Sequence, residues 1–157
     1  MEKVRVSDEL FIGCPEGFHV MSEEELKGMN FMAEGPGIAM KDPDRHILVS
    51  VGVQKLNGFS AMMLNQKELV KNMEKRIEQA QKPYGYHGAE FLTRQAGPDT
   101  ADGVGYEYTA QDVGMYSESF AVKKGKNVTY YHLYARSANK EESLKIWEEI
   151  LGSVEVK

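Results

Sequence analysis

Apolar residues recur along this chain in the two spacings that distinguish strands from helices. Over residues 47–53 every second residue is Ile or Val, which predicts a strand with one buried face. The KDPDR sequence at 41–45 has turn chemistry, so this strand is expected to be the second of a hairpin over 38–53. From Asn65 to about Gln81 apolar residues recur at intervals of three and four instead, which predicts the longest helix.

The other elements follow from turn and capping signals. Ser22 and Glu25 form a capping-box pattern that predicts a short helix ending near Gly28. The KKGKN sequence at 123–127 predicts a solvated turn between two strands. The remaining predicted elements are an opening strand over 4–13, four meander strands over 86–96, 103–111, 114–123 and 127–136, and a last helix from Asn139 to Leu151.

This order of elements is typical of an α+β fold rather than of alternating βαβ units. Along the last predicted strand, Tyr130, His132 and Tyr134 alternate with Tyr131, Leu133 and Ala135, so neither face of the sheet is purely polar. Both faces are therefore expected to be covered by helices.

Composition is consistent with one ordinary globular domain over 1–157. The chain has 157 residues, of which 41% are hydrophobic and 27% charged, and it contains no repeat or linker. A domain of this length can bury about 68–70% of its unfolded surface and needs no metal or disulfide for stability. The net charge of −5 argues against nucleic acid as a partner, because such binding depends on concentrated Lys and Arg.

The amino-terminal residues argue against membrane anchoring. No apolar run reaches the roughly 18 residues that a spanning helix requires. The LFIGC sequence ending at Cys14 resembles a lipoprotein cleavage site, but Asp8 and Glu9 occupy the position of the apolar segment, so that interpretation is rejected. A single cysteine cannot form an internal disulfide, and a cytoplasmic protein with a buried or half-buried structural thiol is expected.

Five segments resemble one known family. They are the strand and Pro-Glu-Gly-Phe turn at 15–18, the long central helix, GVGYEYTA at 103–110, VTYYHLYA at 128–135 and IWEEILGSVEV at 146–156. In pattern and order they resemble the PsbP-like superfamily, which includes the photosystem II extrinsic subunit PsbP, a Ran-binding nuclear-import factor and bacterial proteins of unknown function. The resemblance implies an αβα sandwich with a mostly antiparallel sheet of about six or seven strands. It implies binding and assembly rather than catalysis, and it transfers no functional residue.

The sequence contains no motif that specifies catalysis. The four histidines lie on different predicted elements without the short spacings of a zinc site, so no metal or other cofactor is expected. The glycine pairs lack the Lys-Ser or Lys-Thr of a phosphate-binding loop, and no G-x-S-x-G is present. Glu107 and Glu118 could pair across two strands as catalytic carboxylates or could both be solvated. We therefore expect a protein that is not an enzyme.

Two functional hypotheses remain. The first is a non-catalytic module that binds a protein partner, or a second copy of itself, through methionine- and phenylalanine-rich loops, because flexible thioethers and rings suit adaptable recognition. The opposing structural interpretation is that these loops fold under and fill the edge of the core. The second hypothesis is a small-ligand carrier or weak hydrolase with a pocket between sheet and helix, lined by Tyr130, His132 and Tyr134. The partner-binding residues of the first hypothesis are Met29, Phe31, Met32, Phe59, Met62 and Met63.

Overall fold

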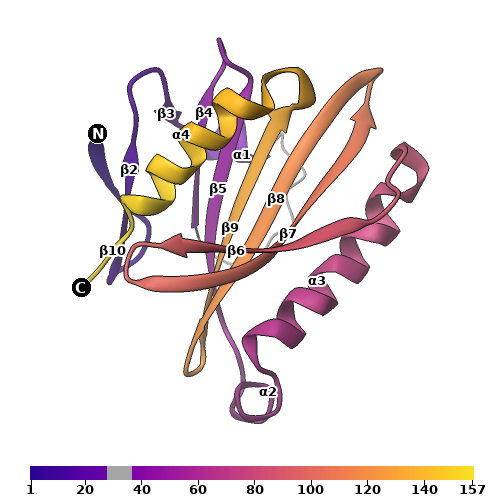
Figure 1. Ribbon diagram of the computed structural model, residues 1–157. Coiled ribbons are helices and arrows are strands. Elements are labelled where there is room, and N and C mark those ends of the chain that lie inside the picture. The colour runs from indigo at the N-terminus through magenta and orange to yellow at the C-terminus, as the bar shows by residue number, and fades with distance from the viewer. Residues whose placement is uncertain (28–36) are drawn as a thin grey trace.

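Two antiparallel sheets and four α-helices make up residues 1–27 and 37–157, which are the residues described by the computed structural model (Figure 1). The larger sheet has seven strands in the order β3-β4-β5-β9-β8-β7-β6. Its strands are β3 (His19–Val20), β4 (Gly37–Asp42), β5 (Ile47–Lys55), β9 (Asn127–Arg136), β8 (Val113–Lys124), β7 (Asp99–Ala110) and β6 (Ala89–Ala96). All of its neighbouring strands are antiparallel, as the predicted meander requires.

Four of the larger sheet's connections are hairpins, and their turns largely follow the sequence signals. The KKGKN sequence forms the turn between β8 and β9, with Gly125 at φ +60°. The predicted strands over 86–96 and 103–111 leave a gap at 97–102, but only Gly97 and Pro98 form the turn, because Asp99 already pairs with Ala96. Gly97 has φ +58°, a left-handed conformation that glycine adopts without strain. This two-residue turn starts β7 four residues earlier than predicted.

The prediction of one continuous opening strand over 4–13 is wrong. The chain instead makes two short strands, β1 (Glu2–Arg5) and β2 (Leu10–Cys14), joined by a tight turn in which the Val6 amide donates to the Leu10 carbonyl at 2.8 Å. They pair with β10 (Glu155–Val156) in a separate three-stranded sheet. The first and last strands of the chain therefore flank β2, with the N-terminus at its Cys14 end and the C-terminus at its Leu10 end (Figure 1).

Capping chemistry places two of the helices as predicted. Helix α1 (Glu23–Lys27) begins after Ser22, whose side chain accepts from the Glu25 amide at 3.2 Å. Helix α3 (Gln66–Gln81) begins after Asn65, which forms a complete capping box with Glu68. The last helix also forms close to its predicted start, and a 3-10 turn, η2 (Ser137–Asn139), leads into it without a side-chain cap from Asn139. The last helix is α4 (Lys140–Gly152), and the helix that no signal predicted is α2 (Gly58–Met63).

The two long helices cover opposite faces of the larger sheet. On one face, Trp147 and Ile150 of α4 pack with Phe120 and Leu133 in the larger hydrophobic cluster. On the other face, Met73 and Ile77 of α3 belong to a second cluster, the α3 cluster, together with Val104, Ala121 and Tyr130. Neighbouring residues of β8 and β9 supply different clusters because side chains alternate between the faces of a strand. The predicted α+β architecture, with helices on both sides of an antiparallel sheet, is confirmed.

Candidate functional site

Helix α2 presents a row of large apolar side chains to solvent. Phe59, Met62 and Met63 have 70%, 78% and 57% of their surface exposed. Their spacing of three and four residues places them on one side of the helix, which we call the α2 face. No residue of α2 is buried. Surface helices normally turn their apolar side toward the core, so this helix is inverted relative to the usual arrangement.

The α2 face is held in place by residues at both ends of the helix. Leu56 before the helix and Leu64 after it pack against the α3 cluster. Asn57 caps the first turn by accepting a hydrogen bond from the Ser60 amide at 2.7 Å, and the Leu64 amide donates to the Ser60 carbonyl at 2.9 Å. Because both ends are anchored, α2 presents its apolar residues in a defined orientation at one end of the molecule (Figure 1).

Three exposed lysines lie in the segments next to α2, and we call them the basic collar: Lys55, Lys67 and Lys126. Lys55 ends β5, and the amide of the next residue, Leu56, donates to the Lys126 carbonyl at 2.7 Å. Lys67 lies in the first turn of α3. All three side chains are exposed and make no ion pair within residues 1–27 and 37–157. Three unpaired positive charges therefore lie in the segments next to α2, with Glu68 beside Lys67 in the first turn of α3, although the chain carries a net charge of −5.

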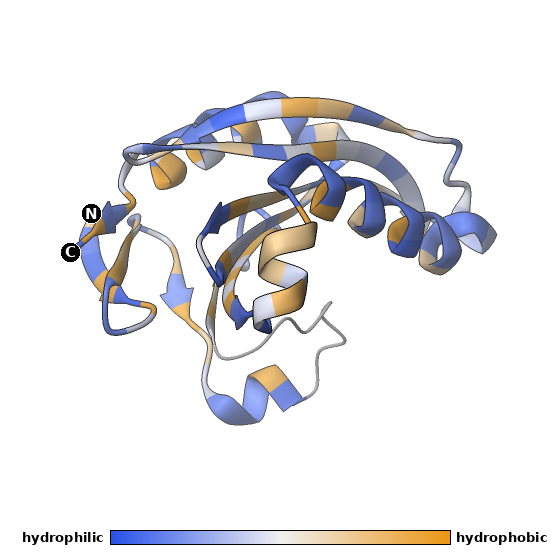
Figure 2. Cartoon of the chain, turned by 90° about the horizontal axis from the view of Figure 1, so that it is seen from below, coloured by the Kyte–Doolittle hydropathy of each residue, from blue (hydrophilic) through white to orange (hydrophobic). Residues whose placement is uncertain are grey.

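Hydropathy separates α2 from the neighbouring helix. Figure 2 views the molecule from below, where the short helix preceding α3 is pale to orange throughout and α3 alternates between blue and orange. The α3 pattern is that of an amphipathic helix with one buried side. Helix α2 has no charged residue, and the polar side chain it does contain is Ser60.

The exposure of Phe59, Met62 and Met63 contradicts the interpretation that these three residues fill the edge of the core. The other three predicted partner-binding residues, Met29, Phe31 and Met32, lie outside the described residues.

The alternative site residues form one row along β9, on the face that α3 covers. The His132 ring lies between the rings of Tyr130 and Tyr134, with centroid distances of 6.4 Å and 6.3 Å. Tyr130 and His132 are buried and Tyr134 is half-buried. His132 Nδ1 lies 2.8 Å from Ser119 Oγ, and the Tyr130 hydroxyl donates to Gln54 Oε1 at 3.1 Å. The structure thus brings the three rings together, and a ligand pocket beside them stays a prediction.

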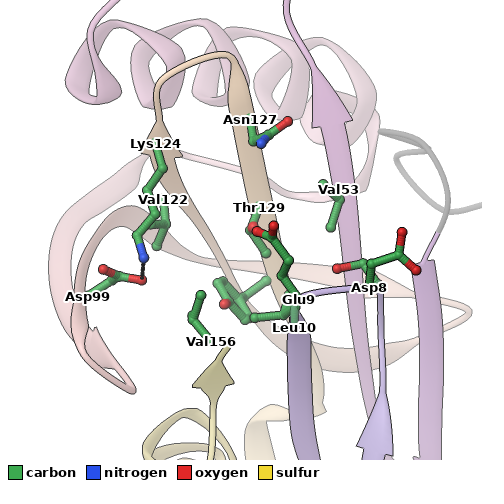
Figure 3. Close-up of a pocket in the computed structure, with 12 residues that line it drawn as sticks. Asp8, Glu9, Leu10, Val53, Asp99, Val122, Lys124, Asn127, Thr129 and Val156 are labelled. Atoms are coloured by element: carbon green, nitrogen blue, oxygen red, sulfur yellow. Dashed lines mark ion pairs between the residues drawn. The ribbon is translucent and has the colours of Figure 1, made fainter.

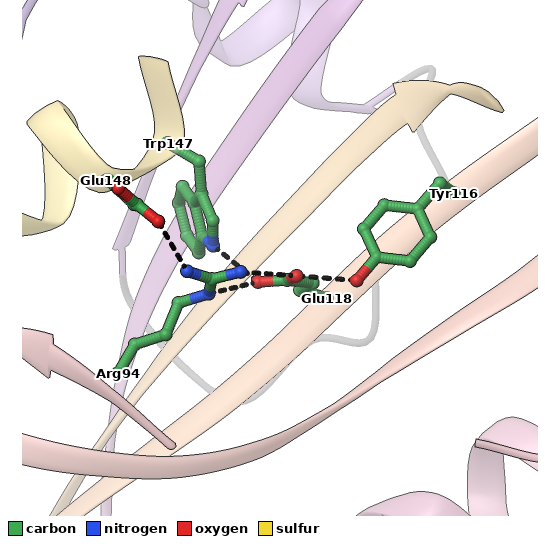
Figure 4. A network of polar contacts seen from close by, with 5 residues as sticks. All are labelled: Arg94, Tyr116, Glu118, Trp147 and Glu148. Carbon is green, nitrogen blue, oxygen red and sulfur yellow. Dashed lines mark hydrogen bonds and ion pairs between the residues drawn. The ribbon is translucent and has the colours of Figure 1, made fainter. Parts of the chain in front are cut away.

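Glu118 forms a polar network that its sequence context did not predict (Figure 4). Its carboxylate is fully buried and accepts two hydrogen bonds from Arg94, at 2.6 Å and 2.9 Å. Tyr116 donates to it at 2.6 Å and the Trp147 indole at 3.0 Å. Burial, followed by the hydrogen bond to Glu118, raises the pKa of Tyr116, and Glu118 raises the pKa of Arg94. Each of the two oxygens of the Glu118 carboxylate therefore accepts two hydrogen bonds from protein donors. The carboxylate has a structural role, because it links β6, β8 and α4.

The network corrects the paired-carboxylate hypothesis. Glu107 is exposed and lies opposite Tyr116, whereas Glu118 is buried opposite Gly105. Glu118 is therefore bound by a guanidinium rather than by a second carboxylate or by water. Its partners Arg94 and Trp147 are 24 and 29 residues away in sequence, and no local spacing signals such a contact.

Other candidate chemistry is limited in the described part of the chain. Cys14 is a buried free thiol, and burial raises its pKa, which makes it a poor nucleophile. No cluster of three His, Cys, Asp or Glu side chains within 1–27 and 37–157 could hold a metal ion. Among the same residues no helix is both long and apolar enough to cross a bilayer.

Solved structures with the same architecture are known from several bacteria. The crystal structure of LpqN, which is involved in cell envelope biogenesis of Mycobacterium tuberculosis, matches with a TM-score of 0.63 at 9% identity, over 99% of this chain and 90% of that one. The solution structure of cyanobacterial PsbP from Synechocystis sp. PCC 6803 matches with a TM-score of 0.61 at 12% identity, over 96% and 88%. A Bacteroides thetaiotaomicron crystal structure matches with a TM-score of 0.58 at 12% identity, over 94% of this chain and 45% of that one. Neither a protein-family model nor a curated protein matches the sequence.

These similarities establish the fold. The chain has a PsbP-like fold, which confirms the resemblance found in its sequence. At 9–12% identity the neighbours carry no residue-level information about a site. Function depends on sites rather than on folds, so any functional conclusion has to rest on the features of this chain.

Proposed function

We propose that this chain is a non-catalytic module that binds a protein partner through the α2 face. The observation that supports the proposal is a helix whose apolar side chains are exposed while both of its ends are anchored in the core. An apolar surface held in this way loses little conformational entropy on binding, which favours affinity. Aromatic residues and methionine are also the apolar types enriched at the centres of protein interfaces.

The basic collar defines the chemistry of the partner. A complementary surface would present an apolar pocket or ridge to Phe59, Met62 and Met63, with Asp or Glu around its rim. Charges at an interface rim mainly raise the association rate and exclude wrong partners. Two copies of this chain paired through α2 in a symmetric dimer would bring two basic collars together, and like charges oppose that contact. We therefore favour a different protein over a second copy.

Localisation in the cytoplasm is part of the same proposal. The sequence contains one cysteine, Cys14, and it is a buried free thiol in the structure. Proteins of reducing compartments rely on their hydrophobic cores rather than on disulfides.

The proposal is tested by capture of the partner with matched surface variants. The double variant Phe59→Ser/Met62→Ser is expected to retain at least tenfold less partner than the unmodified protein, because it removes the centre of the apolar surface. Its melting temperature is expected to stay within about 2 °C, since exposed residues contribute within about 0.5 kcal/mol. Tyr84→Ser, at an exposed aromatic residue beyond the far end of α3, is the control and should bind normally.

A second pair of measurements identifies the type of partner. Lys55→Glu/Lys126→Glu should weaken binding and reduce its dependence on salt, because the collar contributes electrostatic attraction. Light scattering of the purified protein should give the mass of a monomer, and anionic vesicles should not retain it. A large fall in melting temperature for Phe59→Ser/Met62→Ser, a stable dimer, or retention by vesicles would contradict binding to a separate protein.

A further inference from the structure

A pocket of about 320 Å³ lies between the two sheets, on the face of the larger sheet that α4 covers (Figure 3). On the side of the small sheet, the pocket is lined by the turn between β1 and β2, by Leu10 at the start of β2 and by β10. Strands β5, β7, β8 and β9 supply the rest. The pocket is independent of the α2 face and of the row Tyr130, His132 and Tyr134, because Tyr131 lines it and neighbouring residues of a strand point to opposite faces.

The inner part of the pocket is apolar. Leu10, Val53, Val122 and Val156 contribute aliphatic side chains from four different strands. Leu10 and Val122 are buried members of the larger hydrophobic cluster, so the apolar base of the pocket belongs to the rigid core. Such a base suits the hydrocarbon part of a small ligand.

One tyrosine that lines this pocket has a hydroxyl without a protein partner in the described part of the chain. Tyr131 is only 3% exposed, yet its hydroxyl makes no hydrogen bond within the described part of the chain. Burial, followed by the nearby negative charge of Asp99, raises the pKa of Tyr131, so the hydroxyl stays neutral at physiological pH. The hydroxyl opens into the pocket rather than being sealed in the core, so a group in the pocket can satisfy its hydrogen bond. A ligand or a water molecule in the pocket would do so.

Charge at the mouth of the pocket is negative. Lys124 is already paired with Asp99 at 2.8 Å. Asp8 pairs with Arg5 at 2.6 Å, and its carboxylate points away from the pocket (Figure 3). The Glu9 carboxylate points toward Thr129, over the pocket, and makes no ion pair within residues 1–27 and 37–157 (Figure 3). One unbalanced negative charge therefore faces the opening.

We propose that this pocket binds a small organic amine, with its hydrocarbon part on the valine and leucine side chains and its ammonium group between Glu9 and the Tyr131 hydroxyl. An ammonium group donates up to three hydrogen bonds, and both the Glu9 carboxylate and the Tyr131 oxygen can accept one. A carboxylate ligand of the same size would be repelled by the unpaired charge of Glu9. An alcohol could bond to Tyr131 but would gain nothing from the charge of Glu9.

Three six-carbon probes that differ only in their head group test this site: hexylamine, 1-hexanol and hexanoate. Methyl NMR resonances of Val53, Val122 and Val156 should shift on addition of hexylamine to the full chain. The dissociation constant of hexylamine should be at least tenfold lower than that of hexanoate. Equal binding of hexylamine and hexanoate, or no shift with any probe, would overturn the proposal.

Single-group variants identify the polar contacts. Tyr131→Phe, which removes only the hydroxyl, should weaken hexylamine binding about three- to tenfold, the effect of one hydrogen bond. Glu9→Gln should abolish the preference for hexylamine over 1-hexanol. Glu24→Gln, at an exposed carboxylate of α1 outside the pocket, is the control and should leave both dissociation constants unchanged. Unaltered hexylamine binding by Tyr131→Phe and Glu9→Gln would show that the ammonium group does not lie where we place it.

Discussion

Arg94→Met is expected to lower the free energy of unfolding by about 3–5 kcal/mol, because it removes the cation that neutralises a buried carboxylate. The Arg94 side chain is 19% exposed and that of Glu118 is fully buried. Methionine keeps much of the length of arginine, so the loss is mainly one of charge and hydrogen bonding. Tyr116 and Trp147 would still donate to Glu118, but neither carries a positive charge. Urea unfolding followed by far-ultraviolet circular dichroism measures the change.

A surface ion pair provides the matched control for that substitution. Lys3 and Glu155 are also joined at 2.6 Å, but both side chains are about half exposed. Lys3→Met should cost no more than about 1 kcal/mol, the usual range for an exposed pair. A loss for Arg94→Met that is no greater than the loss for Lys3→Met would contradict the structural role assigned to Glu118.

Met73→Ala is expected to lower the free energy of unfolding by about 2–5 kcal/mol, the range for truncating a buried methionine. Met73 is completely buried and packs between α3 and the larger sheet. Met62→Ala, the same change at a 78% exposed residue, should stay within about 0.5 kcal/mol. The two variants carry an identical change in side chain, so the difference between them reports burial alone.

The methionine comparison also separates a binding residue from a core residue. Met62→Ala should leave the free energy of unfolding unchanged and weaken partner binding. Met73→Ala should instead lower the free energy of unfolding. A destabilisation of Met62→Ala by 2 kcal/mol or more would mean that α2 is buried in the folded protein and that the α2 face is not a docking surface.

Local signals were enough to predict most of the larger sheet and three of the four helices. The Asn65–Glu68 capping box and the alternation over 47–53 act within a few residues, and both elements formed where predicted. The small sheet could not be predicted in this way, because β10 pairs with β2 at the opposite end of the chain. The break between β1 and β2 carries a local signal that was missed, because the turn over 6–9 contains Ser7 and Asp8, two residue types that favour turns.

The candidate sites were less predictable than the fold. The apolar composition of 59–63 was visible in the sequence, but whether these residues are core or surface depends on the anchoring of Leu56 and Leu64. The basic collar joins lysines from β5, α3 and the turn between β8 and β9, and only the folded chain brings them together. The pocket beside Tyr131 depends on the same long-range packing, since its walls come from both sheets.

The most direct test of the proposed function is site-specific photocrosslinking in cells that produce the full chain. A benzophenone amino acid at position 62 should form an adduct with one other protein, and the crosslinked segment should be apolar and bordered by Asp or Glu. The same amino acid at position 84 should form no such adduct, and substitution of Lys55 and Lys126 by Glu should weaken the adduct at position 62. No adduct at position 62, an identical adduct at position 84, or crosslinking only to a second copy of the chain would contradict the proposed function.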